Sequence, residues 1–190
     1  MKTPKTDLTD DRVNGRLAHL RPKCQEAAVL IVVSNDGRLL FIRRPARPED
    51  PHAGQIAFPG GRIEAGESSE AAALRELEEE TGISAAQVEI VDRLPGLTTV
   101  ATGFWITPFV ARIVASTHPP LRLDPSEAEE GLWIPETRLR NPAIQRKEWF
   151  EAKGYRVRNH IFAVTTPPIW GATGAILADY LARSNEEDDA

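Results

Sequence analysis

The sequence predicts a single mixed α/β domain, and two observations support this fold class. The chain has 190 residues, of which 41% are hydrophobic, and this is enough to bury a sizeable core. Runs typical of strands and stretches typical of helices follow one another without a linker between them. We therefore expect one domain over residues 27–184, preceded by a helical extension over 1–26 and followed by a disordered acidic tail over 185–190.

The first predicted elements are a helix and a hairpin. In the N-terminal extension, Leu8, Val13, Leu17 and Leu20 recur on roughly one helical face, which predicts a short packing helix. The apolar run AAVLIVV and the later run RLLFIRR predict two strands, and the intervening SNDG is typical of a hairpin turn.

The central segment predicts a loop, a short strand and a helix. Three prolines among charged residues indicate a loop over 46–54, and QIAF at 55–58 predicts a strand that Pro59 and two glycines stop. A helix is predicted over 68–81, with Gly82 as its C-cap.

The C-terminal half predicts more strands and a last helix. Pro108 interrupts one strand pattern, and we expect a bulge or a sheet edge there. The predicted strands are 88–94, 104–114, 131–134 and 161–164, and the predicted helix is 175–184.

Charge and cysteine content exclude several classes of protein. The net charge of −5 argues against sequence-independent binding of nucleic acid. No apolar stretch approaches the roughly 20 residues that cross a bilayer, and the charged N-terminus does not resemble a secretory signal. The lone Cys24 excludes an internal disulfide framework and a metal site made of cysteines. These features predict a cytoplasmic protein without a membrane or nucleic-acid partner.

Four glutamates crowd the end of the predicted helix over 68–81. Glu76, Glu79 and Glu80 stand at i, i+3 and i+4, which places three carboxylates on one face, while Glu78 points elsewhere. Each such pair of like charges costs an isolated helix about 0.2–0.5 kcal/mol. Since carboxylate oxygens are natural ligands for Mg²⁺, which reaches substrates through their phosphate oxygens, the spacing favours a metal site that handles phosphates over a solvated acidic face.

Residues around this cluster support a site of that kind. Gly60 and Gly61 after Pro59 allow the backbone to approach a metal or a phosphate closely. Arg75 lies about 100° away from Glu76 around the helix, where it can pair with Glu67 and hold the preceding loop against the helix.

The whole segment fits the pattern G-x5-E-x7-R-E-U-x-E-E-x-G-U, where U is apolar. The match is complete at Gly61, Glu67, Arg75, Glu76, Leu77, Glu79, Glu80, Gly82 and Ile83. From average composition, a chance match anywhere in the chain is on the order of one in ten million. The pattern is the signature of the Nudix hydrolases, and the sequence resembles that family.

This resemblance implies an α/β/α sandwich with a mixed sheet, and Mg²⁺ or Mn²⁺ as the cofactor. By position, Glu76, Glu79 and Glu80 are expected to be metal ligands, together with the carbonyl of Gly60. Glu67 and Arg75 are expected to be a structural pair, and Gly61 and Gly82 structural glycines. The general base stays open among Glu76, Glu79 and a carboxylate of the later SEAEE segment, namely Glu127, Glu129 or Glu130.

Flanking segments resemble the subgroup of coenzyme A pyrophosphatases. The shared segments are LLFIRR, HAGQIAFPGG, TGFWITPFV, DPSEAEEGLWIP and IWGATGAIL. Gly174 departs from the bulkier or alanine-type helix former that is common in this subgroup, and the loop before His52 is about two residues longer. Because coenzyme A carries a 3′-phosphate, its recognition favours guanidinium groups, and we expect Arg43, Arg44, Arg62 and His52 to bind substrate.

The resemblance therefore predicts hydrolysis of coenzyme A or acyl-coenzyme A to 3′,5′-ADP and 4′-phosphopantetheine or its acyl form. One alternative is a Nudix pyrophosphatase that acts on ADP-ribose, a dinucleotide or an oxidised nucleotide. Another alternative, from a different class, is a non-catalytic Nudix-like ligand sensor, although a sensor would not need all three helix glutamates and Arg75. The expected partner is a small nucleotide substrate. The sequence does not determine the oligomeric state, and a homodimer is kept as one alternative.

Overall fold

The computed structural model describes residues 21, 23–48, 50, 52–99, 101–114, 118–152 and 155–188. The helix that the sequence predicts within residues 1–26 lies outside the described residues, as do the last two residues of the predicted acidic tail.

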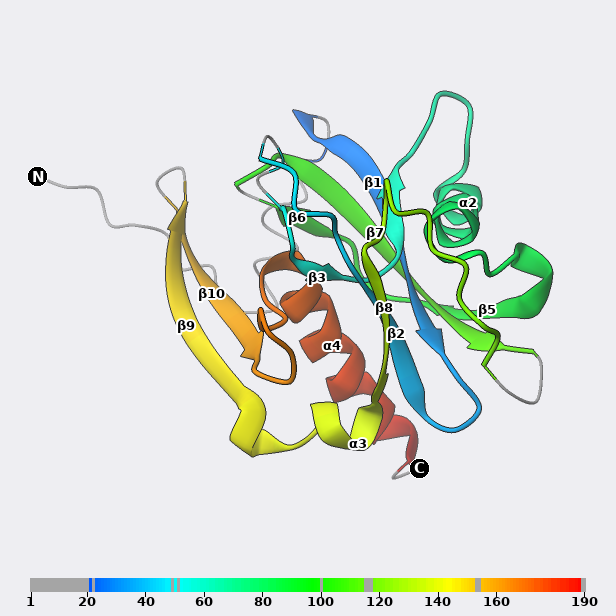
Figure 1. Ribbon diagram of the computed structural model, residues 1–190. Coiled ribbons are helices and arrows are strands. Elements are labelled where there is room, and N and C mark those ends of the chain that lie inside the picture. The colour runs from blue at the N-terminus through cyan, green and yellow to red at the C-terminus, as the bar shows by residue number, and fades with distance from the viewer. Residues whose placement is uncertain are drawn as a thin grey trace, which may run out of the picture.

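One mixed sheet forms the centre of the domain (Figure 1). Strands β1 and β7 run parallel to each other, and the other neighbouring strands of this sheet are antiparallel. The strand order is β3 (Ile56–Ala57), β2 (Arg38–Arg43), β1 (Gln25–Val33), β7 (Phe104–Ile113) and β5 (Val88–Arg93); in addition β4 (Gly60–Arg62) pairs with β1, β6 (Leu97–Thr99) with β7, and β8 (Glu130–Pro135) with β2.

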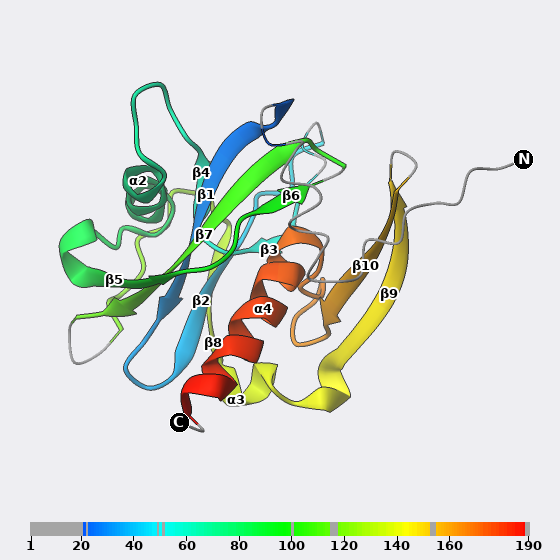
Figure 2. The ribbon, with the colours of Figure 1, turned by 180° about the vertical axis from the view of Figure 1, so that it is seen from behind.

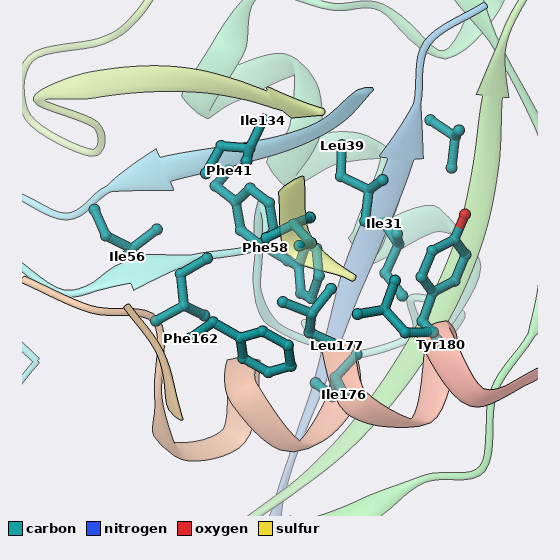
Figure 3. Packing of buried hydrophobic residues seen from close by; sticks show 14 of the residues in the cluster. Ile31, Leu39, Phe41, Ile56, Phe58, Ile134, Phe162, Ile176, Leu177 and Tyr180 are labelled. Atoms are coloured by element: carbon teal, nitrogen blue, oxygen red, sulfur yellow. The ribbon is translucent and has the colours of Figure 1, made fainter. Parts of the chain in front are cut away.

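Helices α2 (Ser69–Thr81) and α4 (Gly171–Asp188) cover opposite faces of this sheet, as the two views in Figures 1 and 2 show. Side chains of alternate parity along β1 divide between two cores, because successive residues of a strand point to opposite faces. Leu30 packs with Leu77 of α2, whereas Ile31 packs with Leu177 of α4. Figure 3 shows the core on the α4 side, where the Phe41 and Phe58 rings stack with their centroids 4.7 Å apart. The predicted α/β/α sandwich is confirmed.

Helix α2 begins one residue after the predicted start, with Ser68 as its N-cap, and ends at the predicted C-cap Gly82. The Ser68 hydroxyl accepts a hydrogen bond from the Ala71 N–H at 3.1 Å, which satisfies one of the free N–H groups of the first turn. At the other end Gly82 takes the left-handed conformation (φ 73°), and its N–H donates to the Glu78 carbonyl oxygen at 2.8 Å.

Pro108 lies inside the sheet, so the predicted edge is wrong. Strand β7 pairs with β1 on one side. On its other side β5 ends opposite Phe109 and β6 begins opposite Ile106, which leaves a gap at Pro108. A proline that cannot donate a hydrogen bond is tolerated there because it faces the gap between two partner strands. The predicted bulge is not at Pro108 either, because β7 pairs with β1 through this residue without a register shift; the shift lies in the neighbouring strand β5, between Ile90 and Asp92.

Several elements were not predicted. Strand β4 continues the chain where the glycines were expected to stop it, and a separate hairpin pairs β9 (Gln145–Ala152) with β10 (Tyr155–Phe162), whereas the sequence predicted one short strand over 161–164. The remaining short elements are helix α3 (Glu136–Leu139) and two 3₁₀ turns at Ala85–Gln87 and Pro142–Ile144.

Helix α4 is longer than predicted at both ends. It begins at Gly171 and runs to Asp188, so residues 185–188 of the predicted disordered tail are helical. Gly174 brings it close to the hairpin, because a Cβ atom at this position would lie 2.2 Å from the His160 carbonyl oxygen. This close approach gives a physical reason for glycine where the subgroup has a better helix former. Within the described residues, no helix is long and apolar enough to cross a membrane.

Candidate active site

Strand β4 brings two glycines against helix α2. Gly60 lies opposite Val29 and Gly61 opposite Ala28 of β1. A Cβ atom at Gly60 would lie 2.3 Å from the Ala28 carbonyl oxygen, and one at Gly61 would lie 2.3 Å from Glu76 Oε1. Both positions therefore require glycine, and the backbone of the loop touches the carboxylate face of the helix.

Glu80 is the most buried carboxylate of the site, with only 2% of its surface exposed. Gly60 donates its backbone N–H to Glu80 Oε2 at 2.9 Å. Burial raises the pKa of Glu80 to about 8; the Gly60 N–H and the charge of Arg44 oppose this rise, and the charges of Glu76 and Glu127 add to it. A buried carboxylate surrounded by other carboxylates favours a bound cation.

Arg75 connects the loop to three carboxylates. Its Nε lies 3.0 Å from Glu67 Oε1, and its Nη1 lies 2.9 Å from both Glu76 Oε1 and Glu79 Oε2. Its Nη2 donates to the Arg62 carbonyl oxygen at 3.1 Å, and its hydrogen bond to Glu67 lowers the pKa of that carboxyl. The predicted ion pair with Glu67 is present. The contacts with Glu76 and Glu79 were missed, although the i, i+4 spacing of Arg75 and Glu79 was a signal for one of them.

The predicted metal ligands Glu76, Glu79 and Glu80 are not assembled into a ready metal site. Among the described residues, no three His, Cys, Asp or Glu side chains are grouped so that they could hold a metal ion. The physical reason is that the Arg75 guanidinium already neutralises Glu76 and Glu79, while Glu80 turns to the Gly60 N–H. The chemistry of the donors still fits a divalent cation, since burial raises the pKa of Glu76 as it does that of Glu80.

Among the loop candidates for the general base, Glu127 interacts electrostatically with the glutamates of α2. The charge of Glu127 raises the pKa of both Glu76 and Glu80, which places Glu127 near them. The loop before it is shaped by Asp124, whose Oδ1 accepts from the Ser126 N–H at 2.8 Å. Of the other two candidates in this segment, Glu130 is paired with Arg43 and Glu129 donates its N–H to the Arg43 carbonyl oxygen.

The two predicted arginines at the end of β2 already have acidic partners. Arg43 Nε lies 2.8 Å from Glu130 Oε2, and its Nη1 donates to the Thr166 carbonyl oxygen at 2.9 Å. Arg44 Nη2 lies 2.8 Å from Asp50 Oδ2. Asp50 was missed, because a carboxylate six residues away in a proline-rich loop carries no periodic signal. The charge of Arg44 lowers the pKa of Glu80, so the structure places Arg44 near the carboxylate cluster.

The structure separates the other two predicted substrate residues. His52 donates its N–H to Asp50 Oδ1 at 2.9 Å, and its ring Nδ1 lies 3.1 Å from Gln55 Oε1. It therefore belongs to the same loop network as Arg44. The Arg62 guanidinium instead lies 5.4 Å from the centre of the Phe104 ring, and only the backbone of Arg62 contacts the Arg75 cluster.

The chain is similar to a known protein family and to curated relatives. Residues 25–156 match a family model described as the NUDIX domain. The chain is 42% identical over 123 residues to an uncharacterized Nudix hydrolase, NudL, of Citrobacter koseri, covering 60% of this chain and 63% of the relative. It is 40% identical over 121 residues to the protein of the same name in Enterobacter sp. (strain 638), covering 59% of this chain and 62% of the relative. The matches thus span less than two thirds of the length of these relatives.

A solved structure with a similar arrangement is a MutT protein from Methanosarcina mazei Go1. It is 23% identical, and the match covers 60% of this chain and 80% of that chain with a TM-score of 0.49.

Proposed function

Because the chain belongs to the Nudix family through its NUDIX domain at residues 25–156, we propose that it hydrolyses nucleoside diphosphates linked to a further group. The observation that carries this proposal is the contact between the Gly60–Gly61 backbone and the carboxylates of Glu76 and Glu80. It combines a backbone that a phosphate can approach closely with a group of acidic oxygens that favours a cation.

A divalent cation, Mg²⁺ or Mn²⁺, would be held by Glu76, Glu79 and Glu80, with the Gly60 carbonyl as a further ligand. When bound, it would lower the pKa of a water molecule and neutralise charge on the diphosphate. The residues of the chain position these groups. The Gly60 N–H orients Glu80, and Arg75 holds the loop through Glu67 and the Arg62 carbonyl oxygen.

The attacking water needs a base, and Glu127 is our first candidate for that role. Its charge acts on both Glu76 and Glu80, two of the residues that would hold the cation, and this supports Glu127 as the group that would take the proton from the attacking water. Glu76 and Glu79 are the alternatives. No covalent intermediate with the protein is required, because water would attack one phosphorus of the diphosphate directly and the group that carries the other phosphate would leave.

Coenzyme A or acyl-coenzyme A is the substrate that we propose. The products would be 3′,5′-ADP and 4′-phosphopantetheine or its acyl form. Arg44 and His52 both contact Asp50, while Arg43 contacts Glu130, and all three would contact substrate phosphates, with Arg43 and Arg44 exchanging their present carboxylate partners for phosphate. Arg62, whose guanidinium lies over the Phe104 ring, would contact the substrate from that position.

A substrate panel tests the proposal. The protein is incubated with Mg²⁺ or Mn²⁺ and with coenzyme A, dephospho-coenzyme A, ADP-ribose or a dinucleoside polyphosphate, and the products are identified by mass. We expect 3′,5′-ADP from coenzyme A at the highest kcat/KM of the panel. A higher kcat/KM for ADP-ribose would reject the coenzyme A assignment alone. No turnover of any compound would reject the proposed hydrolysis and favour the non-catalytic ligand sensor.

A further inference from the structure

One face of the β9–β10 hairpin combines an exposed aromatic ring with three basic side chains. In the register of the hairpin, Trp149 lies opposite Arg158, and Lys147 lies opposite His160. Cross-strand partners and alternate residues of a strand share a face, so these four side chains lie on the same side of the hairpin. We call these four residues the basic hairpin face.

The basic hairpin face continues outward from the hydrophobic core. The next pair on this side is Gln145 with Phe162, and Phe162 is buried in the core with Leu177 of α4. The hairpin lies alongside α4 in both ribbon views (Figures 1 and 2). Phe162 anchors the base of the hairpin, and the four residues extend from that base toward its free end.

The basic hairpin face carries two permanently charged cations, Lys147 and Arg158. In the described part of the chain, neither Lys147 nor Arg158 forms an ion pair, whereas Arg146 on the opposite face pairs with Glu148 at 2.9 Å. The register places one carboxylate on the basic hairpin face, Glu151, at the free end opposite Arg156. Burial, then the charges of Lys147 and Arg158, lower the pKa of His160, so the two cations act on the ring beside them.

An aromatic ring beside guanidinium and ammonium groups matches the chemistry of a nucleotide. Trp149 is 43% exposed, which leaves part of its surface accessible for stacking with a base. Arg158 can grip a phosphate with two parallel N–H donors, and Lys147 adds a point charge on the next pair. We propose that the basic hairpin face binds one nucleotide, with its base against Trp149 and its phosphate against Arg158 and Lys147.

The face fits a single nucleotide better than a nucleic-acid strand. Its exposed aromatic residue is Trp149, while Phe150, which is 45% exposed, lies on the opposite face of the hairpin. A strand-binding surface instead uses several rings in succession along a basic groove. The net charge of −5 also disfavours a long polyanion.

The nucleotide has two candidate sources, the nucleotide end of the proposed substrate or a separate nucleotide. The segment after β10 contacts the proposed active site, because the Thr166 carbonyl oxygen accepts from Arg43 Nη1 at 2.9 Å. Assignment to the substrate rests on the proposed function, whereas binding itself does not.

Calorimetric titration of the full chain with 3′,5′-ADP in excess chelator tests binding without turnover. We expect Trp149→Ala and Arg158→Ala to weaken binding about tenfold, since a lost charge-assisted or stacking contact has that size. Phe150→Ala and Arg146→Ala are matched controls on the same strand but on the opposite face, and we expect them to bind within twofold of the native chain. Arg158→Gln provides a second variant, and thermal unfolding checks that each protein is folded. No binding to the native chain, or equal losses in the controls, would overturn the proposal.

Turnover of coenzyme A by the same variants identifies the source of the nucleotide. A KM raised about tenfold in Arg158→Ala at unchanged kcat would assign the face to the nucleotide end of the substrate. Weaker binding of 3′,5′-ADP at unchanged KM would assign it to a separate nucleotide. If the native chain does not cleave coenzyme A, the proposed function fails, while the titration in chelator still decides whether the face binds nucleotide.

Discussion

The backbone N–H of Gly60 donates to Glu80 Oε2 at 2.9 Å, and this hydrogen bond joins the glycine loop to the carboxylate face of helix α2. It does not by itself compensate for the burial of Glu80, whose pKa is raised to about 8. A buried carboxylate near Glu76 and Glu127 destabilises the metal-free protein, and a cation bound there would offset this cost.

The first prediction concerns the requirement for this carboxylate. Glu80→Gln is expected to lower kcat at least about 100-fold. The reason is that loss of a ligand weakens the binding of a cation that would stabilise the charge of the transition state by several kcal/mol. Glu78→Gln is the matched control, since Glu78 is exposed on the same helix. Steady-state kinetics with Mg²⁺, with circular dichroism to check folding, measure the effect. Full turnover in excess chelator would contradict the metal requirement.

The second prediction concerns pH and stability without metal. The pKa of Glu80 is about 8 in the folded protein, above its ordinary value of 4.5. Between these two pH values Glu80 holds its proton in the folded protein and has lost it in the unfolded chain. The free energy of unfolding should therefore fall as pH rises through this window, by at most about 1.4 kcal/mol per pH unit from this group. Glu80→Gln should remove that decline and be more stable than the native chain at pH 9. Urea unfolding in chelator at pH 5 to 9 measures both proteins, and parallel pH profiles would contradict the prediction.

The third prediction separates a structural role from a catalytic one. Arg75→Ala should lower the free energy of unfolding by about 1–3 kcal/mol together with activity, because it removes a partly buried, charge-assisted contact with Glu67. Arg146→Ala removes an exposed pair with Glu148 and should cost less than about 1 kcal/mol. Chemical denaturation compares the two variants. An Arg75→Ala protein of native stability would instead indicate that Arg75 contacts substrate.

The fourth prediction concerns the general base. Glu127→Gln should lower kcat about 100-fold while leaving the affinity for Mn²⁺ within a few-fold, because a base acts on water and need not hold the cation. Glu129→Gln, two positions away in the same loop, is expected to keep native kcat. Kinetics and Mn²⁺ titration followed by electron paramagnetic resonance give the two readouts. Unchanged kcat in Glu127→Gln would leave Glu76 and Glu79 as the candidates.

Local signals predicted the elements that position the site. Gly82 predicted the end of α2, and the glutamate spacing predicted which carboxylates share its face. Apolar runs predicted β1, β2 and β7 because both faces of these strands are buried. These features follow from short-range rules, and the structure retains them.

Long-range pairing was not predictable from the same rules. Strand β4 is a strand only because Gly60 and Gly61 find a partner in β1, and glycine carries no strand propensity. The β9–β10 hairpin was missed because its exposed, charged sequence lacks an apolar face. Partner choice was missed as well, since the partner of Arg44 is Asp50, a carboxylate in an irregular loop.

The last prediction concerns the 3′-phosphate of coenzyme A. If Arg43 and Arg44 bind this phosphate, coenzyme A should have a kcat/KM roughly 10- to 150-fold higher than dephospho-coenzyme A, as expected for loss of one charge-assisted contact. Both arginines now contact carboxylates, Arg43 at Glu130 and Arg44 at Asp50, so phosphate has to compete with these partners. Arg44→Ala should remove most of the preference and leave turnover of dephospho-coenzyme A nearly intact. Asp50→Asn should increase the preference, because it weakens the competing partner of Arg44.

Arg112→Ala, at an exposed position of β7, serves as the charge-matched control. Equal kcat/KM for the two coenzymes in the native chain would reject recognition of the 3′-phosphate. Loss of the preference in Arg112→Ala as well would attribute it to overall charge and not to Arg43 and Arg44.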